Sequence, residues 1–455
     1  MTRQDLPQKF IILSLIFIIG FILILQPAKQ TLPKRASKAH HPEKSITIFW
    51  AEWAPAHDLQ ALGKEFTKET GIKVIVKTSP FTRWQNETFQ ELNKHAQTFD
   101  LIVGDSQWLG RGSTEGHYIE LTRWIKEKEI DKTMTAASLS GYAEYPKGSG
   151  KYWGVPLEGD AMGWAYRKDK FEDPKEMAAF KAKYGYELAV PKTWAELRDI
   201  AEFFYRPNEN FYGVSIITME AYDGITMGFE NVLFSFGGEW GTNDYKIKGV
   251  VNSENGKKAL EFYKELYKFC PPGWEHAFWT EDAEAITQGK TAMSMNFFAF
   301  FPDLINPKIN PYAHVTGFFA NPKGPDGKNF SALGGMGISL ISYSKKKDLA
   351  FLFLAWLAKD AVQQKWADLG GYTCDKDVLN SGAFLKATPY NKAFKESMEM
   401  VKDFWVTPEY DTLLAVSQKY LHGYVVDNQF SSREALDLLA DDWENIFEYA
   451  GYYKE

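Results

Sequence analysis

The sequence predicts an α/β protein made of two units that are joined by crossing strands. Residues 45–103 alternate between strand and helix patterns, and a second run of the same kind follows residue 191. Between them, residues 151–171 (KYWGVPLEGDAMGWAYRKDKF) form two aromatic-rich extended runs with a polar break at Glu158, Gly159 and Asp160. Strands that alternate with helices indicate parallel sheets covered by helices. A chain that continues past such a break would cross from one unit to the other and leave a carboxylate between them. An ordinary hairpin is the alternative.

The first unit has the order strand, helix, strand, helix, strand. Runs of apolar residues predict the strands, and a helical apolar period predicts the helices. Gly71 ends the first helix, because glycine adopts the left-handed conformation that closes a helix. Ligands bind beyond the carboxyl ends of parallel strands, so three loops become candidate ligand loops. The predicted elements are a strand at 45–50, a helix at 58–70, a strand at 72–77, a helix at 84–96 and a strand at 99–103, and the loops are 51–57, 78–82 and 104–116.

The second unit repeats the alternation. Thr193 is placed to cap a helix, with Glu196 three residues later as in a capping box, and Ser253 is placed to cap another. The predicted elements are helices at 191–204, 253–269 and 283–288, strands at 212–217, 291–296, 315–319 and 337–341, and mostly helical stretches at 345–368 and 389–448.

The composition is that of a globular protein with an acidic surface. Its 455 residues suffice for two or three domains, and 45% of them are hydrophobic and 24% charged. The formal net charge is −7, and the acidic excess grows when the basic residues 1–44 are left out. Such a surface repels nucleic acid and anionic lipid, so neither is an expected partner. The 15 Trp, 23 Tyr and 33 Phe suggest a ligand site with flat apolar walls.

The two cysteines and the N-terminus bear on the compartment. Cys270 and Cys374 form no CxxC motif, and they could pair in an oxidising compartment or stay as two buried thiols. Arg3 and Lys9 precede an uncharged apolar run at 10–25, which predicts an export signal within residues 1–27. The run is long for a signal and short for a full span, so both a cleaved signal and a retained membrane anchor stay open. Residues 28–44 predict a flexible spacer.

Catalytic motifs are absent from the sequence. It contains no GxSxG, HExxH, P-loop or GxGxxG pattern, and its eight histidines are scattered. Adjacent carboxylates such as Glu281 and Asp282 predict solvated helix ends. A glycosidase needs two carboxyl groups across a cleft, which 59 acidic residues always leave open. No catalytic residue, metal or cofactor is expected.

The loop at 104–116 offers groups that bind sugars. Asp105, Gln107 and Trp108 directly follow a strand and supply a carboxylate, an amide and a flat ring. Sugar hydroxyls need such polar partners, and the C–H face of a sugar ring needs an apolar surface. The alternative is that Asp105 caps a helix and Trp108 packs in the core.

Other segments supply further candidates. In WAEWAP, Glu52 and Trp53 lie at the same sheet edge, with Trp53 alternatively covering the end of the sheet. For any phenylalanine in NFFAF, simple core packing is the alternative. The remaining candidates are Trp240 in GGEW, Asn296 and Phe298 in NFFAF, and Gly334, Gly335 and Met336 in GGM.

Seven segments in this order resemble the extracellular solute-binding proteins of sugar ABC importers, the group that includes maltose-binding protein. The resemblance covers residues 45–455. The segments are TIFWAEW with LGKEFTKETGIKV, FDLIVGD, KYWGVPLEGDAMGWAYRKDKF, PKTWAELRDIA, ENGKKALEFYKEL, GKTAMSMNFF and GGMGISLISYSKKKDLAFLFLAWL.

The resemblance implies the type II periplasmic-binding-protein fold, with two α/β lobes joined by crossing hinge strands that close over a ligand. It implies that Asp160 is a sugar-binding acid after the first crossing, and that Glu220 and Tyr222 supply an acid and a stacking ring. It places Asp105 and Trp108 on the ligand loop of the first lobe. The expected divisions are 45–158 for the first lobe, 159–330 for the second, 331–374 for a return to the first, and 375–455 for the second lobe with the C-terminal helices.

The resemblance also implies a function. A monomer would capture a sugar or related polyhydroxylated solute and deliver it to ABC permease membrane subunits. No cysteine comes directly after the apolar run, so a lipid anchor is not expected. A periplasmic location is expected instead. The alternatives are a tethered or secreted carbohydrate-active enzyme and a solute-sensing accessory protein without a permease.

Overall fold

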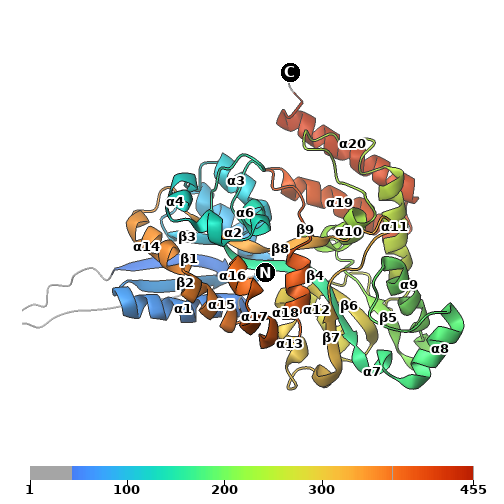
Figure 1. The fold of residues 1–455 in the computed structure, drawn as a ribbon. Coiled ribbons are helices and arrows are strands. Elements are labelled where there is room, and N and C mark those ends of the chain that lie inside the picture. Colours follow the sequence, from blue (N-terminus) through green and yellow to red (C-terminus); the bar gives the residue numbers. More distant parts are fainter. Residues whose placement is uncertain (1–43, 371, 454–455) are drawn as a thin grey trace, which may run out of the picture. The chain divides into compact units, whose positions relative to one another are not determined.

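Nine strands form one sheet whose middle strands are shared by two lobes (Figure 1). The computed structural model describes residues 44–370 and 372–453. The strand order is β2-β1-β3-β8-β4-β6-β5, with β7 beside β4 and β9 beside β8. The strands are β1 (Ser45–Ala51), β2 (Lys73–Ser79), β3 (Leu101–Asp105), β4 (Val155–Arg167), β5 (Tyr212–Ser215), β6 (Thr291–Phe297), β7 (Thr316–Phe319), β8 (Ser331–Leu340) and β9 (Val401–Lys402).

The first lobe is built on β1, β2 and β3. Strand β1 pairs in parallel with β2 and with β3, as its strand–helix alternation predicts. The first helix ends where expected, at Gly71, whose φ of 73° is left-handed and whose N–H bonds to the carbonyl of Thr67. The helices are α1 (Ala54–Thr70), α2 (Phe81–Asn93), α3 (Leu109–Thr114), α4 (Thr122–Glu127), α5 (Ile130–Thr133), α6 (Ala136–Tyr142), α14 (Lys347–Leu357) and α15 (Asp360–Asp368), with the 3-10 helix η1 (Ser106–Trp108).

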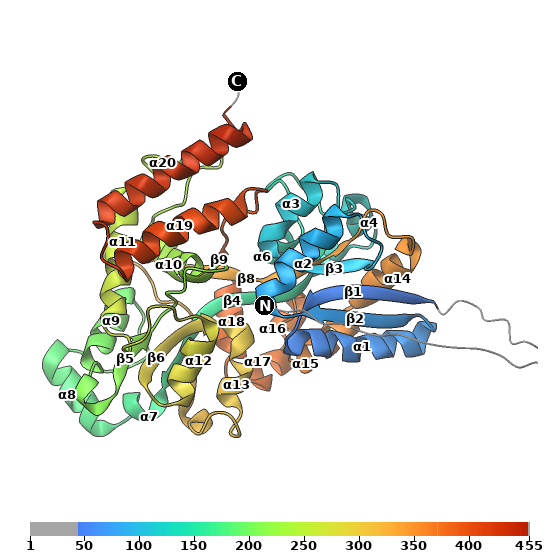
Figure 2. The same ribbon diagram turned by 180° about the vertical axis from the view of Figure 1, so that it is seen from behind.

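Strands β4 and β8 cross between the lobes, and both views show them between β1–β3 and β5–β6 (Figure 2). The first part of β4 pairs antiparallel with β8, and its second part pairs with β6 and β7. The strand break expected at Glu158–Asp160 is wrong. The chain stays extended over all 13 residues of β4, with one shift of register between Pro156 and Glu158. Pairing with β8 holds these polar residues in the strand, and on the other edge the N–H of Gly159 donates to the carbonyl of Tyr372 at 2.6 Å.

The second lobe surrounds β5, β6 and β7. Both expected helix caps are confirmed: Thr193 Oγ1 accepts from the N–H of Glu196 at 3.1 Å, and Ser253 Oγ accepts from the N–H of Gly256 at 3.3 Å. The helices are α7 (Lys168–Phe171), α8 (Pro174–Tyr184), α9 (Trp194–Phe203), α10 (Gly224–Ser235), α11 (Glu254–Tyr267), α12 (Trp279–Thr287) and α13 (Pro302–Ile305), with the 3-10 helices η2 (Pro207–Glu209), η3 (Phe298–Phe300) and η4 (Ala313–Val315).

The C-terminal segment is helical, as expected. Its last two helices pack on each other and on α10 and α11. Trp443 is fully buried there, and its Nε1 donates to the carbonyl of Leu413 at 2.9 Å. The helices are α16 (Lys376–Asn380), α17 (Gly382–Ala387), α18 (Asn391–Met398), α19 (Tyr410–Val425) and α20 (Ser432–Ala450).

Two expectations concern the compartment. Cys270 and Cys374 are both buried and free in the structure, which corresponds to the second alternative for the cysteines. No helix within the described residues is long and apolar enough to span a membrane. The expected signal or anchor at 1–27 and the spacer, apart from Lys44, lie outside the described residues.

Candidate ligand-binding site

A small, partly open cavity of about 40 Å³ lies against the crossing strands. Both lobes and both crossing strands contribute to its lining. The lining residues are Trp53, Phe81, Asp105 and Gln107 from the first lobe, Tyr222, Asp223, Phe278, Trp279, Phe297 and Phe300 from the second, and Glu158, Asp160, Leu333, Gly334, Gly335 and Met336 from the crossing strands.

Two glycines let β8 lie close to β4 at the floor of the cavity. Gly335 has a φ of 90°, and a Cβ there would lie 2.4 Å from the carbonyl oxygen of Glu158. A Cβ on Gly334 would lie 2.7 Å from the ring of Phe297. Tyr142 Oη also donates to the carbonyl of Gly334 at 2.5 Å. Only residues without a side chain fit here, since φ is left-handed at Gly335 and both sites lack room.

Two buried carboxyl groups project from β4 into the cavity. Glu158 and Asp160 are two residues apart on one strand, so their side chains leave the same face. Asp160 Oδ1 accepts hydrogen bonds from the N–H of Ala161 at 2.8 Å and of Ala299 at 3.2 Å. Burial raises the pKa of Asp160. The pKa of Glu158 is also raised, by burial first and then by the charges of Asp160 and Asp105.

A hydrogen bond joins the lobes at the cavity. Asp105 ends β3, and its Oδ2 accepts from Tyr222 Oη of the second lobe at 2.7 Å. Its Oδ1 accepts from the N–H of Gln107 at 3.3 Å, the helix-cap role foreseen for this residue. Burial raises the pKa of Asp105, although the bond from Tyr222 works to lower it.

Four rings from the two lobes form a closed circuit of contacts beside the carboxyl groups. Trp53 lies edge-on to Phe81, with 5.4 Å between ring centroids. Phe81 contacts Trp279 at 5.4 Å, and Trp279 stacks on Phe300 at 5.4 Å and 4°. Phe300 returns to Trp53 at 6.3 Å. Rings from both lobes thus contact one another at the cavity, so the two lobes are closed on each other here.

Eight of the fourteen candidate residues line this cavity. They come from both lobes and both crossing strands, although each was chosen from its own stretch of sequence. They are Trp53, Asp105, Gln107, Asp160, Tyr222, Gly334, Gly335 and Met336.

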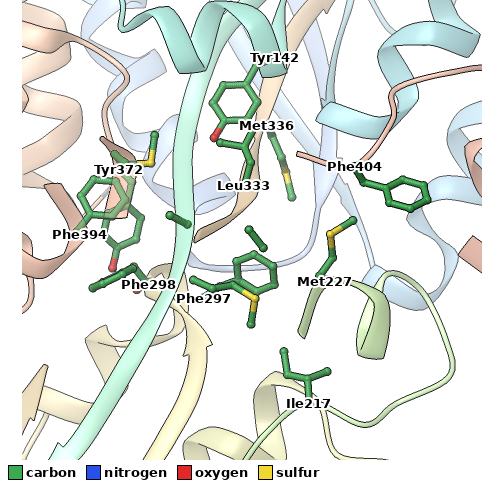
Figure 3. Packing of buried hydrophobic residues seen from close by; sticks show 14 of the residues in the cluster. Tyr142, Ile217, Met227, Phe297, Phe298, Leu333, Met336, Tyr372, Phe394 and Phe404 are labelled. Carbon is green, nitrogen blue, oxygen red and sulfur yellow. Dashed lines mark hydrogen bonds between the residues drawn. The ribbon is translucent and has the colours of Figure 1, made fainter. Parts of the chain in front are cut away.

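Three aromatic candidates lie in the core instead. Trp108 is fully buried and packs against Trp84 with 4.3 Å between centroids, as its packing alternative foresaw. Trp240 is buried among the rings of the second lobe. Phe298 follows the cavity-lining Phe297 but turns the other way. Figure 3 shows Phe298 beside Tyr372 and Phe394, across β4 from Phe297, Leu333 and Met336.

Two polar candidates lie away from the cavity with protein partners. Glu52 is exposed and accepts hydrogen bonds from His57 and Thr78. Asn296 is buried, and its Nδ2 donates to the carbonyl of Trp279 at 2.8 Å. Asn296 therefore holds the backbone of a cavity-lining residue.

Glu220 is the sixth candidate that lies outside the cavity, and it belongs to a cluster with two histidines. Its Oε2 lies 2.8 Å from His276 Nδ1 and 3.4 Å from His422 Nε2. These three atoms lie within 4.8 Å of one another, a geometry that could hold a divalent metal. Burial works to raise the pKa of Glu220, and the hydrogen bond with His276 lowers it below its usual value. Without a metal, the same geometry suits ion pairs between Glu220 and the two histidines when these are protonated.

Sequence reasoning missed eight lining residues. Strand alternation from Asp160 could have identified Glu158, because a carboxyl group two residues earlier leaves the same face. Phe297 and Phe300 lie in NFFAF beside the chosen Phe298, and only the turn after β6 decides which rings face the cavity. No local pattern marks the others. The missed residues are Phe81, Glu158, Asp223, Phe278, Trp279, Phe297, Phe300 and Leu333.

Two α/β lobes, two crossing strands and a cavity lined by both lobes define the two-lobed architecture of solute-binding proteins. The sequence model of the family described as bacterial extracellular solute-binding proteins matches residues 52–364. This match covers more than half of the chain, which therefore belongs to this family, and the fold is the type II periplasmic-binding-protein fold.

Relatives and solved structures agree with this assignment. A probable amino-acid ABC transporter periplasmic-binding protein of Sinorhizobium fredii is 25% identical over 379 residues, 81% of this chain and 80% of the relative. The structure of maltose-bound MalE3 of T. maritima has a TM-score of 0.75 at 20% identity, covering 88% of this chain and 99% of that one. A ribitol complex of a solute-binding protein from Agrobacterium radiobacter has a TM-score of 0.74 at 21% identity, covering 89% and 99%.

Proposed function

We propose that this protein is the substrate-binding component of an ABC importer and captures a sugar or related polyhydroxylated solute. The observation that carries the proposal is the cavity that both lobes and both crossing strands line. The names of its relatives support a small solute, since they refer to an amino acid, maltose and ribitol. The aromatic walls suit the C–H face of a sugar, and the carboxyl and amide groups suit its hydroxyls.

Ligand binding would close the lobes. A ligand shifts a conformational equilibrium only if it binds one state better than the other. A solute in this cavity meets Trp53 and Asp105 on one lobe and Trp279 and Tyr222 on the other only when the lobes are closed. The closed protein would then dock on the permease subunits, and ATP hydrolysis in the importer would drive release.

The remaining parts of the proposal follow from this role. The protein would act outside the cytoplasmic membrane, in a periplasm, after export by its N-terminal segment, as a monomer and without turning over its ligand. The alternatives are a carbohydrate-active enzyme and an accessory sensor without a permease.

A thermal-shift screen against sugars and polyols tests the proposal, because a ligand that binds only the folded state raises the Tm. We expect at least one member of the panel to raise the Tm in proportion to the logarithm of its concentration. Stimulation of the ATPase of reconstituted permease by the liganded protein would support an importer. Glycoside turnover that is lost in Asp160→Asn would favour the enzyme. A ligand response without any permease partner would favour the sensor.

A further inference from the structure

The cavity carries acidic groups and no basic ones. Four of its lining residues are carboxylic acids: Asp105, Glu158, Asp160 and Asp223. Among the described residues that line it, none is lysine, arginine or histidine. A neutral sugar could bond to these groups but could not balance their charge. Buried carboxylates stay charged only where a cation or several donors compensate them.

Glu158 has no partner within the protein. Its side chain is fully buried, and neither carboxyl oxygen receives a hydrogen bond. Elsewhere the same fold pairs a buried acid well. Asp100 is 5% exposed and accepts from the N–H of Thr47 at 2.9 Å, from Ser344 at 2.7 Å and from Lys346 at 3.4 Å. Because Glu158 also lines the cavity, its two unpaired oxygens mark a place for a donor that comes from outside the chain.

The aromatic circuit supplies a second feature that attracts cations. Trp53 and Phe81 of one lobe and Trp279 and Phe300 of the other contact one another in turn. The face of each ring carries partial negative charge and attracts a nearby ammonium group, most strongly for tryptophan. The rings and the carboxyl groups thus both favour a positively charged ligand.

We propose that the solute captured here carries a positively charged nitrogen, as in an amino sugar or an amino alcohol. The cation lies against Glu158 and Asp160, with the rings around it. This inference rests on the proposed capture of a solute and narrows its class. Trp53 also lines the cavity and its Nε1 is buried without a partner, so it can donate to a hydroxyl oxygen of the ligand.

The other titratable groups around Glu158 do not compensate it. Besides Asp160 and Asp105, they are Tyr142, Tyr372 and Cys374. Burial raises the pKa of each of these last three, so all three are neutral at physiological pH. A cation requires the ionised carboxylates, whereas a neutral sugar can use the protonated ones as donors. Affinity for a ligand that stays positively charged therefore rises with pH, and affinity for a neutral sugar does not.

Matched ligand pairs test the charge. Glucosamine is compared with glucose, and choline with its uncharged analogue 3,3-dimethylbutan-1-ol, by thermal shift and calorimetry at several pH values. We expect at least one cation to bind about tenfold or more tightly than its neutral partner, and for choline, whose charge does not depend on pH, we expect the difference to grow as pH rises. Neutral partners that bind equally well or better would overturn the inference and leave solute capture intact. A protein that responds to neither pair nor to the sugar panel would overturn both.

Two buried-acid variants separate binding from folding. Glu158→Gln keeps the shape of the side chain and removes its charge. We expect it to raise the Tm of the free protein and to abolish the preference for the cation. Glu230→Gln is the control, because Glu230 is equally buried, has an oxygen without a partner and does not line the cavity. Equal loss of both ligands in Glu158→Gln would show that Glu158 only donates or accepts hydrogen bonds, which would overturn the inference.

Discussion

Single residues decide how closely the crossing strands approach. At Gly335 the left-handed φ and the carbonyl oxygen of Glu158 both exclude a side chain. At Tyr222 the φ of 56° holds a non-glycine residue in the same region, and its hydroxyl reaches Asp105 on the other lobe. Such backbone conformations cost free energy and persist where surrounding contacts fix them.

Gly335→Ala is expected to destabilise the protein by about 3 kcal/mol or more, because it adds both backbone strain and a clash with the neighbouring strand. Gly327→Ala provides the control. Gly327 also has a left-handed φ, of 82°, but nothing lies within 4 Å of the Cβ position, so the cost there is about 1 kcal/mol. Urea denaturation measures both values. Equal losses of stability in the two variants would show that the close approach of the strands adds nothing to the cost of the substitution at Gly335.

Tyr222→Phe is expected to shift the free protein toward an open form, since it removes a charge-assisted hydrogen bond between the lobes that is worth about 1.5–3 kcal/mol. The radius of gyration from small-angle scattering should increase. In Tyr420→Phe the lost bond, from Tyr420 Oη to Asp442 at 2.7 Å, lies between α19 and α20 within one lobe. This control should leave the radius unchanged, and an equal increase in both variants would contradict the role of Tyr222.

Asp403 gives a pH dependence whose sign can be worked out. Burial raises its pKa from 3.8 to about 7, although hydrogen bonds from the backbone of Phe404 and the side chain of Ser106 work to lower it. The folded state therefore holds this proton more tightly than the unfolded state. Its contribution to stability is complete below pH 3.8 and is lost as the pH rises toward 7, at up to about 1.4 kcal/mol per pH unit. In Asp403→Asn this loss should disappear, so the Tm difference from the wild type should grow between pH 4 and pH 7. A constant difference would refute the assignment.

At the scale of elements, one asparagine ties a helix to both crossing strands. Asn231 of α10 is fully buried. Its Oδ1 accepts from the N–H of Ala332 in β8 and from Asn321 Nδ2, both at 2.7 Å. Its Nδ2 lies 3.0 Å from the sulfur of Met162 in β4. The helix is thus fixed to the hinge side of the second lobe.

Asn231→Ala is expected to lower stability by about 2–4 kcal/mol, because the N–H of Ala332 loses the acceptor that Asn231 provides and the buried amide of Asn321 loses one of its hydrogen bonds. Asn255→Ala on the neighbouring helix α11 is the control, since Asn255 is exposed and its Nδ2 donates to the carbonyl of Gly237 at 3.2 Å. The loss of stability in Asn255→Ala should stay within about 0.5 kcal/mol. Thermal unfolding compares the two, and similar losses would argue against a structural role for the buried network.

Elements were predictable to the extent that local signals define them. Gly71, Thr193 and Ser253 act on their own helices, so the sequence located those ends correctly. The prediction failed at the polar residues of β4, because carboxyl groups suggest a break in a strand when its pairing with β8 is not known. The length of β8 was underestimated for the same reason: its glycines suggest a loop unless their close contact with β4 is known.

At the scale of the whole protein, closure of the lobes is linked to the charge of the carboxyl groups in the cavity. Rings and hydrogen bonds join the lobes across a cavity with four carboxyl groups. At the rim, Gln85 Nε2 of α2 donates to Tyr410 Oη of α19 at 2.7 Å. Closing the lobes around unpaired carboxylates costs electrostatic free energy, and a bound cation would offset it. This arrangement would make closure depend on the solute.

The sequence by itself determined the fold class, the two α/β units, the family and eight of the residues around the cavity. These depend on local periodicity, on caps and on loops that follow strands, which neighbouring residues encode. Tertiary structure alone decided that Trp108, Trp240 and Phe298 pack in the core while Phe81 and Trp279 face the cavity. It also decided that Glu158 is left without a partner. The direction of a side chain and its partners depend on segments far apart in the chain, and no local pattern specifies how those segments meet.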